Sequence, residues 1–329
     1  MRREASVIMM YAITSVHAGT GSSASYIDLP VQREVNTELP VIYASEVRGI
    51  FRSNFFDLTV GKTGNVEELK ENVEKFVKVF GGGKDVEDFI KSFEGKLSKE
   101  EKEELKELKE LAKPANSASS ISFTDARLLF FPVRSLKGVI AWITSPYVLN
   151  RFVRDISAFS EKEYEDIRKN IANLVVKDDE VIVTENSDIT FEDKGKTAVF
   201  EDFVLKVNDD LKIDDVINWI RNYMPDLVDF EFFKRHVAVV SDDVLRDLTR
   251  MGAEITPRIK INKETGTVDS GALWYEENVP AEAVLYSVVI GNLPEELERM
   301  KAVQIGGNAS LARGIFNVKV LEVTEDENN

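Results

Sequence analysis

The chain has 329 residues, and its 43% hydrophobic and 9% aromatic content is ordinary for a globular protein of one large or two medium domains. It has no cysteine and only two histidines, which excludes disulfides and thiolate metal sites, argues against a structural zinc site and favours a reducing, cytoplasmic location. The formal net charge of −16 argues against a nucleic-acid partner unless the acidic residues are concentrated in a few segments.

Five stretches rich in β-branched and apolar residues are predicted as strands. The first, residues 5–16, follows basic residues, but its apolar run is short and contains Tyr and Thr, so a strand is favoured over a signal peptide. No later run reaches the roughly 18 apolar residues that a membrane helix needs, so we expect no membrane partner. The other four predicted strands are residues 236–241, 254–262, 282–293 and 314–323.

Two helices are predicted among these strands. Residues 45–56 begin with Ser45, which is placed as an N-cap, and carry apolar residues on one face. Residues 133–153 are predicted as a second apolar helix, which Pro146 divides. Strands and helices mixed in this order favour an α+β fold with a mainly antiparallel sheet.

Residues 65–113 differ in character from the rest of the chain. Leu, Val and Phe recur at helical spacing among Glu and Lys, opposite charges stand four residues apart, and the glycines at 81–83 interrupt the pattern. We expect an inserted helical subdomain with a solvated surface and a small core of its own. The acidic stretch 176–216 is predicted to form two short strands joined by a polar connection, and no function is assigned to it.

The negative charge is concentrated in three segments. Residues 65–113 hold 14 acidic and 11 basic residues, residues 155–216 hold 18 and 8, and residues 322–329 hold four acidic residues and no basic one. The rest of the chain carries 23 Lys and Arg and is almost neutral, so it has room for a basic groove.

A glycine-rich motif near the C-terminal end, "IGGNASLARGIFNV", places Gly306, Gly307 and Gly314 around Arg313. Glycines let a backbone approach a phosphate closely and expose its N–H groups, and an Arg adds charge. The spacing matches neither the P-loop nor the dinucleotide-binding motif. Taken alone, the motif is more typical of a tight structural turn.

A hairpin is predicted around a Thr-Gly turn, with Trp274 and Tyr275 followed by Glu276 and Glu277 on its second strand. Exposed aromatic residues there could stack on bases, although packing against the domain is the commoner role of Trp.

His17 and Asp28 lie in the stretch "HAGTGSSASYIDLPVQRE", residues 17–34, which has a Gly-Ser-rich part without hydrophobic periodicity. An ionised Asp can bind a metal ion, accept a proton or orient another group. An Asp before Leu-Pro in a loop is, however, more often a turn-forming residue.

Four blocks of the sequence, in order, resemble the backbone subunit of Cmr-type (type III-B) CRISPR effector complexes, a member of the RAMP superfamily. They are residues 17–52, "FTDARLLFFPVRSLKGVIAWITSPYVLNRF" at 123–152, "GALWYEENVP" at 271–280 and "IGGNASLARG" at 305–314. Three positions depart from the usual pattern: Glu46 stands close to Arg48, Ala312 replaces a common glycine, and Asn278 occupies a position where an aromatic can be found.

The resemblance implies an RNA-recognition-like (ferredoxin-like) palm, formed by residues 1–64 and 114–329, with residues 65–113 inserted and a thumb hairpin at about 255–290. It implies a subunit that assembles with copies of itself into a filament on guide RNA, together with other Cmr-type subunits. The complex would cleave complementary target RNA at regular intervals, in defence against foreign nucleic acid. Pairing with the guide would then supply sequence recognition, so the protein needs only backbone contacts and shape recognition.

By the same resemblance, Asp28 is required for cleavage that depends on a divalent metal ion, Mg²⁺ or Mn²⁺, with His17 and Glu276 as supporting groups. Residues expected to bind RNA are Arg33, Ser45, Arg48, Arg52, Arg127, Arg134, Lys137, Trp274, Gly306, Gly307 and Arg313. For each basic residue a surface ion pair is the alternative. Two other functions stay open: a catalytically silent subunit that only organises RNA, and an unrelated enzyme for a small molecule, which requires the resemblance to be accidental.

Overall fold

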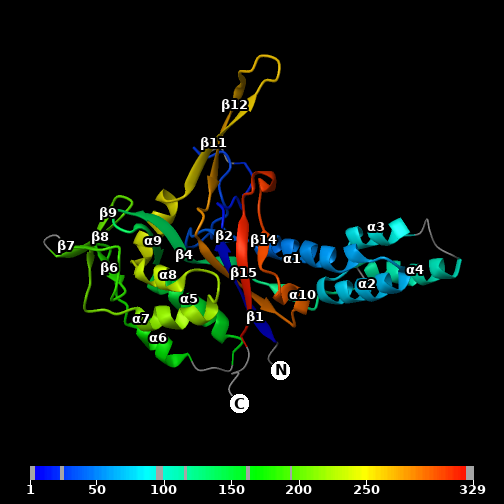
Figure 1. Cartoon of the computed structure of the whole chain (residues 1–329), viewed down its shortest axis with the longest axis horizontal. Helices are drawn as coiled ribbons and strands as arrows, with labels where there is room; N and C mark the ends of the chain where they lie inside the picture. Colours follow the sequence, from blue (N-terminus) through cyan, green and yellow to red (C-terminus); the bar gives the residue numbers. More distant parts are fainter. Residues whose placement is uncertain are drawn as a thin grey trace.

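The computed structural model describes residues 4–22, 26–93, 99–114, 117–160, 164–192 and 195–323. Across these ranges a large mixed sheet forms the middle of the molecule, with helices packed on it and a hairpin projecting from it (Figure 1). Its strand order is β14-β15-β1-β13-β4-β5-β10-β6-β9-β8-β7, with β2 paired to β4 and β3 paired to β13. The pairs β5–β10 and β6–β9 are parallel and the others are antiparallel, which confirms the predicted α+β class.

The central strands are buried on both faces. β1 (Ala5–Ala12) lies between β13 (Val284–Ile290) and β15 (Ile315–Glu322), with β14 (Ala302–Gln304) beyond β15. Burial on both faces explains why β1 and β13 have nearly continuous apolar runs instead of alternation. β1, β13, β15 and β10 (Val237–Val239) confirm four of the five predicted strands with shorter bounds, and the fifth is confirmed by a strand over Glu254–Ile261.

The prediction of one helix over residues 133–153 is wrong. The chain there forms β4 (Ala126–Ser135), β5 (Val139–Thr144) and α5 (Pro146–Ser157). Gly138, with a φ of 79°, lies in the turn between the strands, and Pro146 begins the helix instead of dividing it. Strands buried on both faces have no period-2 pattern, so their apolar run was indistinguishable from that of a buried helix.

The helix predicted over residues 45–56 exists, but Ser45 is not its N-cap. α1 (Ala44–Leu58) begins one residue earlier, with Tyr43 at the N-cap and no capping bond from that side chain. Asp125, more distant in sequence, accepts a hydrogen bond from the Ala44 backbone N–H at 2.8 Å. The Asp125 carboxylate therefore accepts a hydrogen bond from the helix N-terminus, the capping role that the local sequence had assigned to Ser45.

The inserted segment forms α2 (Val66–Phe80), α3 (Lys84–Phe93) and α4 (Lys99–Ala112), at the right of Figure 1. Phe55 of α1 lies 5.9 Å from Phe76 and 5.7 Å from Phe80, and Phe80 stacks on Phe123. The described buried apolar residues form one cluster that runs from the sheet into these helices. The expectation of a separate small core is therefore wrong, because α1 shares its apolar face with the insert.

The acidic region lies at the end of the sheet farther from the insert, at the left of Figure 1, and its strands belong to that sheet. Its residues 197–207, predicted as one strand, form a hairpin that reverses at Glu201, where φ is 50°. The elements on this side are α6 (Glu165–Ala172), β6 (Glu180–Val183), β7 (Phe191–Glu192), β8 (Lys196–Phe200), β9 (Phe203–Val207), α7 (Asp214–Ile220), α8 (Phe230–Arg235) and α9 (Asp242–Met251). The short elements elsewhere are β2 (Val41–Ile42), β3 (Ser122–Phe123), α10 (Glu295–Glu298) and the 3-10 helices η1 (Val60–Lys62), η4 (Arg221–Tyr223) and η5 (Ala309–Leu311).

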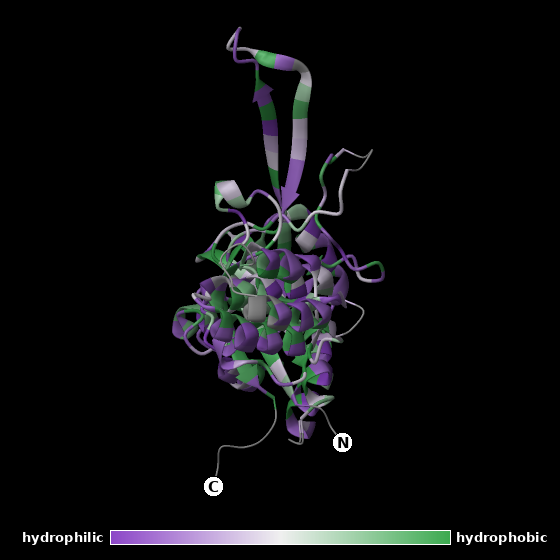
Figure 2. Ribbon diagram, turned by 90° about the vertical axis from the view of Figure 1, so that its right-hand side faces the viewer, coloured by the Kyte–Doolittle hydropathy of each residue, from purple (hydrophilic) through white to green (hydrophobic). Residues whose placement is uncertain are grey.

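A two-stranded hairpin, β11 (Glu254–Ile261) and β12 (Val268–Asn278), projects from the body (Figures 1 and 2). It ends at Asn278, so the last part of the segment predicted at about 255–290 is the buried strand β13 of the main sheet. Only the base of the hairpin contacts the body, and its outer part is held by its own ladder. In the described ranges no helix is long and apolar enough to cross a membrane.

Candidate active site at the base of the hairpin

The segment that carries Asp28 pairs with the outer edge of β12. The Leu29 N–H donates to the Tyr275 carbonyl at 3.1 Å, and the Glu277 N–H donates to the Leu29 carbonyl at 3.0 Å. The next donor on this edge, the Tyr275 N–H, binds Oδ2 of Asp28 at 2.7 Å. These bonds fix the half-buried Asp28 carboxylate at the base of the hairpin, where it can bind a cation or accept a proton.

His17 is anchored to the same edge of β12. Its Nδ1 lies 2.7 Å from the Glu277 carbonyl, which can only accept, so Nδ1 is the donor and Nε2 is left as the acceptor in the neutral ring. The residue is 8% exposed, and an ideal Cβ at Gly19 would lie 2.9 Å from Nε2. The structure thus brings His17 and Asp28 to one edge of β12, where they bind the backbone of Glu277 and of Tyr275, two residues apart.

Gly306 and Gly307 pack directly on His17. The Gly307 N–H donates to the His17 carbonyl at 2.8 Å, and a Cβ at Gly306 would lie 2.5 Å from that oxygen. Because a side chain would collide with His17, the glycines are explained by close packing, and RNA contact by them stays a prediction.

Glu276 is buried at the base of the hairpin. Its carboxylate accepts hydrogen bonds from Trp274 Nε1 at 2.9 Å, from Asn308 Nδ2 at 2.8 Å and from Arg258 at 3.3 Å. These partners belong to the hairpin and to the turn before η5, so Glu276 ties the two together. Trp274 uses its only polar atom in this tie, and Arg258 lies 6.0 Å from the centre of its ring.

Glu277 holds the Asp28 segment in place, a role that the sequence did not indicate. Its Oε1 pairs with Arg33 at 2.6 Å, and its Oε2 accepts the Val31 N–H at 3.0 Å. Arg33 also donates to the carbonyls of Glu38 and Thr249. Arg33, predicted to bind RNA, is therefore already a structural anchor of this loop.

An open pocket of about 500 Å³ lies between the hairpin base and η5. Arg313 lines it and pairs with Glu254 at 2.9 Å. Guanidinium and hydroxyl groups in one pocket suit an anionic oxygen such as that of an RNA phosphate. The lining residues are Thr14, Ser15, Thr256, Arg258, Leu311, Ala312 and Arg313.

Three other predicted RNA-binding residues lie on α1. Ser45 is exposed in the first turn. Arg48 donates to the Phe80 carbonyl at 2.6 Å, and its burial, with Arg52 nearby, lowers its pKa. Arg52 pairs with Asp85 at 2.9 Å and lies over the ring of Phe76. The two arginines therefore link α1 to the insert.

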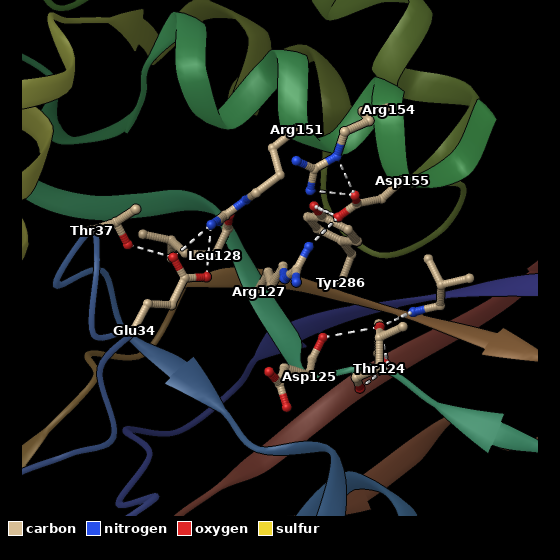
Figure 3. A network of polar contacts seen from close by, with 12 residues as sticks. Glu34, Thr37, Thr124, Asp125, Arg127, Leu128, Arg151, Arg154, Asp155 and Tyr286 are labelled. Atoms are coloured by element: carbon tan, nitrogen blue, oxygen red, sulfur yellow. Dashed lines mark hydrogen bonds and ion pairs between the residues drawn. The ribbon is translucent and has the colours of Figure 1, made fainter. Parts of the chain in front are cut away.

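Arg127 belongs to a polar network between β4, α5 and β13 (Figure 3). It pairs with Asp155 at 2.7 Å, and Asp155 also accepts the Tyr286 hydroxyl at 2.9 Å. Next to them Arg151, 3% exposed at its side chain, binds both carboxylate oxygens of Glu34 at 2.7 Å. Arg127 is thus engaged in a largely enclosed network away from the hairpin.

Arg134 and Lys137 lie around the β4–β5 turn, beside β8. Arg134 Nε donates to Glu201 at 2.7 Å, and Lys137 Nζ donates to the Thr190 carbonyl at 2.7 Å. Their partners belong to the acidic side of the molecule, and the structure does not bring these two residues to the hairpin base.

Asp28 by itself does not form a complete metal site. Among the residues that the structure describes, no three His, Cys, Asp or Glu side chains are grouped as ligands. Asp28 fits as a single oxygen ligand of a divalent cation, and the other ligands would have to come from outside this group of side chains.

Comparisons with known proteins agree with this arrangement. The sequence model of the RAMP superfamily matches residues 10–317. The CRISPR system Cmr endoribonuclease Cmr4 of Pyrococcus furiosus is 32% identical over 337 residues, which cover 98% of each chain. The crystal structure of oligomeric Cmr4 from Pyrococcus furiosus, 28% identical, gives a TM-score of 0.67 over 98% of this chain and 100% of that one.

A chain in the cryo-EM structure of the type III-B Cmr-beta bound to cognate target RNA gives a TM-score of 0.66 over 96% of each chain. At 21% identity this likeness concerns the fold alone. The match to the superfamily, in contrast, extends over most of the chain, and the Pyrococcus furiosus relative aligns along its whole length. The protein belongs to the RAMP superfamily.

Proposed function

We propose that this protein is a backbone subunit of a type III-B (Cmr-type) CRISPR effector complex that binds guide RNA and cleaves the target RNA paired with it. The single observation that carries the proposal is the Asp28 carboxylate held against β12 at the base of a projecting hairpin. Full-length similarity to a Cmr endoribonuclease and to an oligomeric relative supports it. Copies of the chain assemble along guide RNA with other Cmr-type subunits in the cytoplasm.

In this proposal the sheet strands around β1 and β13 are the ferredoxin-like palm, and β11 and β12 are the thumb. The antiparallel pairing of β1 with β13 and β15, and the isolated two-stranded sheet of the hairpin, support this interpretation. The thumb enters the guide–target duplex and displaces a base pair, which bends the target backbone.

A bent backbone brings a ribose 2′-oxygen into line with the adjacent phosphorus. The 2′-oxygen then attacks phosphorus, the bond from phosphorus to the 5′-oxygen breaks, and the leaving oxygen takes up a proton. Asp28 is placed to orient the 2′-hydroxyl or accept its proton, and His17 is the supporting group on the same strand edge. Glu276, tied to Arg258, Trp274 and Asn308, acts by holding the hairpin.

A divalent cation, Mg²⁺ or Mn²⁺, is part of the proposal, and Asp28 is the residue that would hold it. Bound there, the cation would stabilise negative charge at the phosphate. RNA oxygens, water or a neighbouring subunit would complete its ligands.

The decisive experiment compares Asp28→Asn with the unaltered subunit in a complex reconstituted with guide RNA, with and without a chelator. We expect target cleavage to fall by at least about 100-fold in the variant, as for other groups that act in proton transfer, while target binding is unchanged. Asp166→Asn is the matched control, because that side chain is 97% exposed on α6. Equal cleavage by Asp28→Asn would overturn the catalytic assignment.

One observation keeps a second function open, that of a catalytically silent subunit that organises RNA. His17, Glu276 and Glu277 are each engaged in bonds that hold the loop and hairpin together. Cleavage that persists in the Asp28 variant and disappears when another subunit is altered would favour this second function.

A further inference from the structure

Two tyrosines stack beside Asp28. The ring of Tyr26 lies on the ring of Tyr275, with 5.9 Å between centroids and 14° between planes. Tyr26 nevertheless remains 82% exposed. The bond that holds Asp28 also brings the two tyrosines close together, because Asp28 accepts the N–H of Tyr275 and follows Tyr26 by two residues.

The hairpin places this stack on a face that differs from the charged one. Side chains alternate along a strand, so residues opposite one another in the ladder share a face. One face, which we call the charged face, meets the turn around η5. It carries Glu254, Thr256, Arg258, Trp274 and Glu276. The other face carries Pro257 opposite Tyr275 and Ile259 opposite Leu273, and Ile259 and Leu273 are both about half exposed.

An exposed tyrosine held this way is not explained by core packing. Trp274, on the charged face, differs from Tyr26. It donates its ring N–H to Glu276, and Arg258 lies over its ring, so packing within the protein explains its position. Tyr26 buries little surface, and one of its ring faces is used by Tyr275. A flat aromatic surface beside a carboxylate and an apolar strand face suits a nucleobase that has left its pair.

We propose that Tyr26, supported by Tyr275, is a stacking platform for an unpaired nucleobase of the target RNA, and that it positions that nucleotide for cleavage at Asp28. The inference rests on the proposed function and adds a positioning residue to it. Stacking accepts any base because every base has an aromatic face, so the platform adds no sequence preference to that of the guide.

The stacking step can be measured without cleavage. Complexes carrying Asp28→Asn are loaded with target RNA that contains 2-aminopurine at the nucleotide on either side of the linkage cut by the unaltered complex. Stacking on a tyrosine quenches this fluorophore. We expect quenching with Tyr26 and with Tyr26→Phe, which keeps the ring, and its loss with Tyr26→Ala. Val35→Ala is the control, since Val35 is also exposed (93%) and lies in a nearby turn.

The positioning step is measured as the cleavage rate at saturating complex, with Asp28 intact. We expect Tyr26→Ala to slow cleavage by about tenfold, the size of losing one aromatic–base stack, with Tyr26→Phe and Val35→Ala close to the unaltered rate. Unchanged quenching and rate in Tyr26→Ala would overturn the inference. A change in target affinity alone, with the saturated rate unaltered, would also overturn the positioning role. Neither result bears on the catalytic role proposed for Asp28, which is contradicted only if the Asp28→Asn complex cleaves as well as the unaltered one.

Discussion

Two clusters of arginines and carboxylates stand in contrast in this molecule. The network of Arg127, Arg151, Asp155 and Tyr286 lies under α5, and most of its members are well buried (Figure 3). The cluster at the hairpin base contains Arg258 and Arg313, which have side chains 29% and 22% exposed and line an open pocket. The side chain of Arg127 is 31% exposed, as much as those two, so position and not exposure separates the clusters: Arg258 and Arg313 line the pocket at the hairpin base, whereas Arg127 is paired with Asp155 away from it.

The largest effect on stability is expected from Arg151→Leu. Its removal takes away the guanidinium nitrogen that binds both carboxylate oxygens of Glu34 and one donor to the Leu128 carbonyl, so unfolding should become easier by about 3 kcal/mol. Urea denaturation measures the change. Arg154→Leu is the control on the same helix, because its side chain is 62% exposed and its ion pair with Asp155 should contribute little. Equal stability of the two variants would contradict the structural role given to the buried pair of Arg151 and Glu34.

Tyr286→Phe should have a smaller effect, about 1–2 kcal/mol, because it removes one hydrogen bond to a charged acceptor. Burial, with the charge of Asp155 next, raises the pKa of Tyr286 well above its ordinary value. The folded state therefore retains the phenolic proton at a pH where the unfolded chain loses it. This contribution is fully present below about pH 10, the ordinary Tyr pKa, and decreases above it.

The measurement for Tyr286 is the difference in unfolding free energy between the two proteins at pH 8, 10 and 11. The difference should be constant up to about pH 10 and shrink above it, because only the unaltered protein loses the contribution of this phenol. A difference that grows with pH would contradict the sign.

The smallest effect on stability is expected from Arg258→Met at the hairpin base, about 1 kcal/mol or less. Glu276 keeps its bonds to Trp274 and Asn308 in this variant, so the hairpin tie is weakened without being lost. If Arg258 meets a phosphate, the salt dependence of RNA binding should drop by about one unit of slope. Arg127→Met should leave that slope unchanged, and the opposite order would reverse our comparison.

Local pattern predicted some elements well and failed at others for a physical reason. The helix over 66–80 has one apolar face, which confirms the helical spacing predicted over 65–113, and it ends at the first of the glycines at 81–83 that were predicted to interrupt the pattern. Over 133–153 the later residues of β5 are buried on both faces, so no period-2 alternation marked the strand and a strand pair was taken for a helix. Ser45 was predicted as an N-cap, but the helix starts at Ala44, and Asp125 accepts the hydrogen bond of the Ala44 N–H.

The candidate site was only partly accessible to sequence reasoning. Resemblance pointed to Asp28, His17 and Glu276, and the structure places the first two on one edge of β12. The local pattern gave no reason to prefer Tyr26 over Trp274 as a stacking residue, because the face of a strand that meets the body depends on contacts with η5. Glu277 was missed for the same reason, since its partner Arg33 lies 244 residues away.

The sequence by itself determined the α+β class, the amphipathic insert, the hairpin and, through four ordered blocks, the family. These depend on residue periodicity, turn residues and motifs, which are local properties of a chain. Only the tertiary structure decided which arginines line the pocket at the hairpin base, which face of the hairpin is charged and how Asp28 is held. Those properties arise from hydrogen bonds between segments more than 200 residues apart, such as Asp28 to Tyr275 and His17 to Glu277.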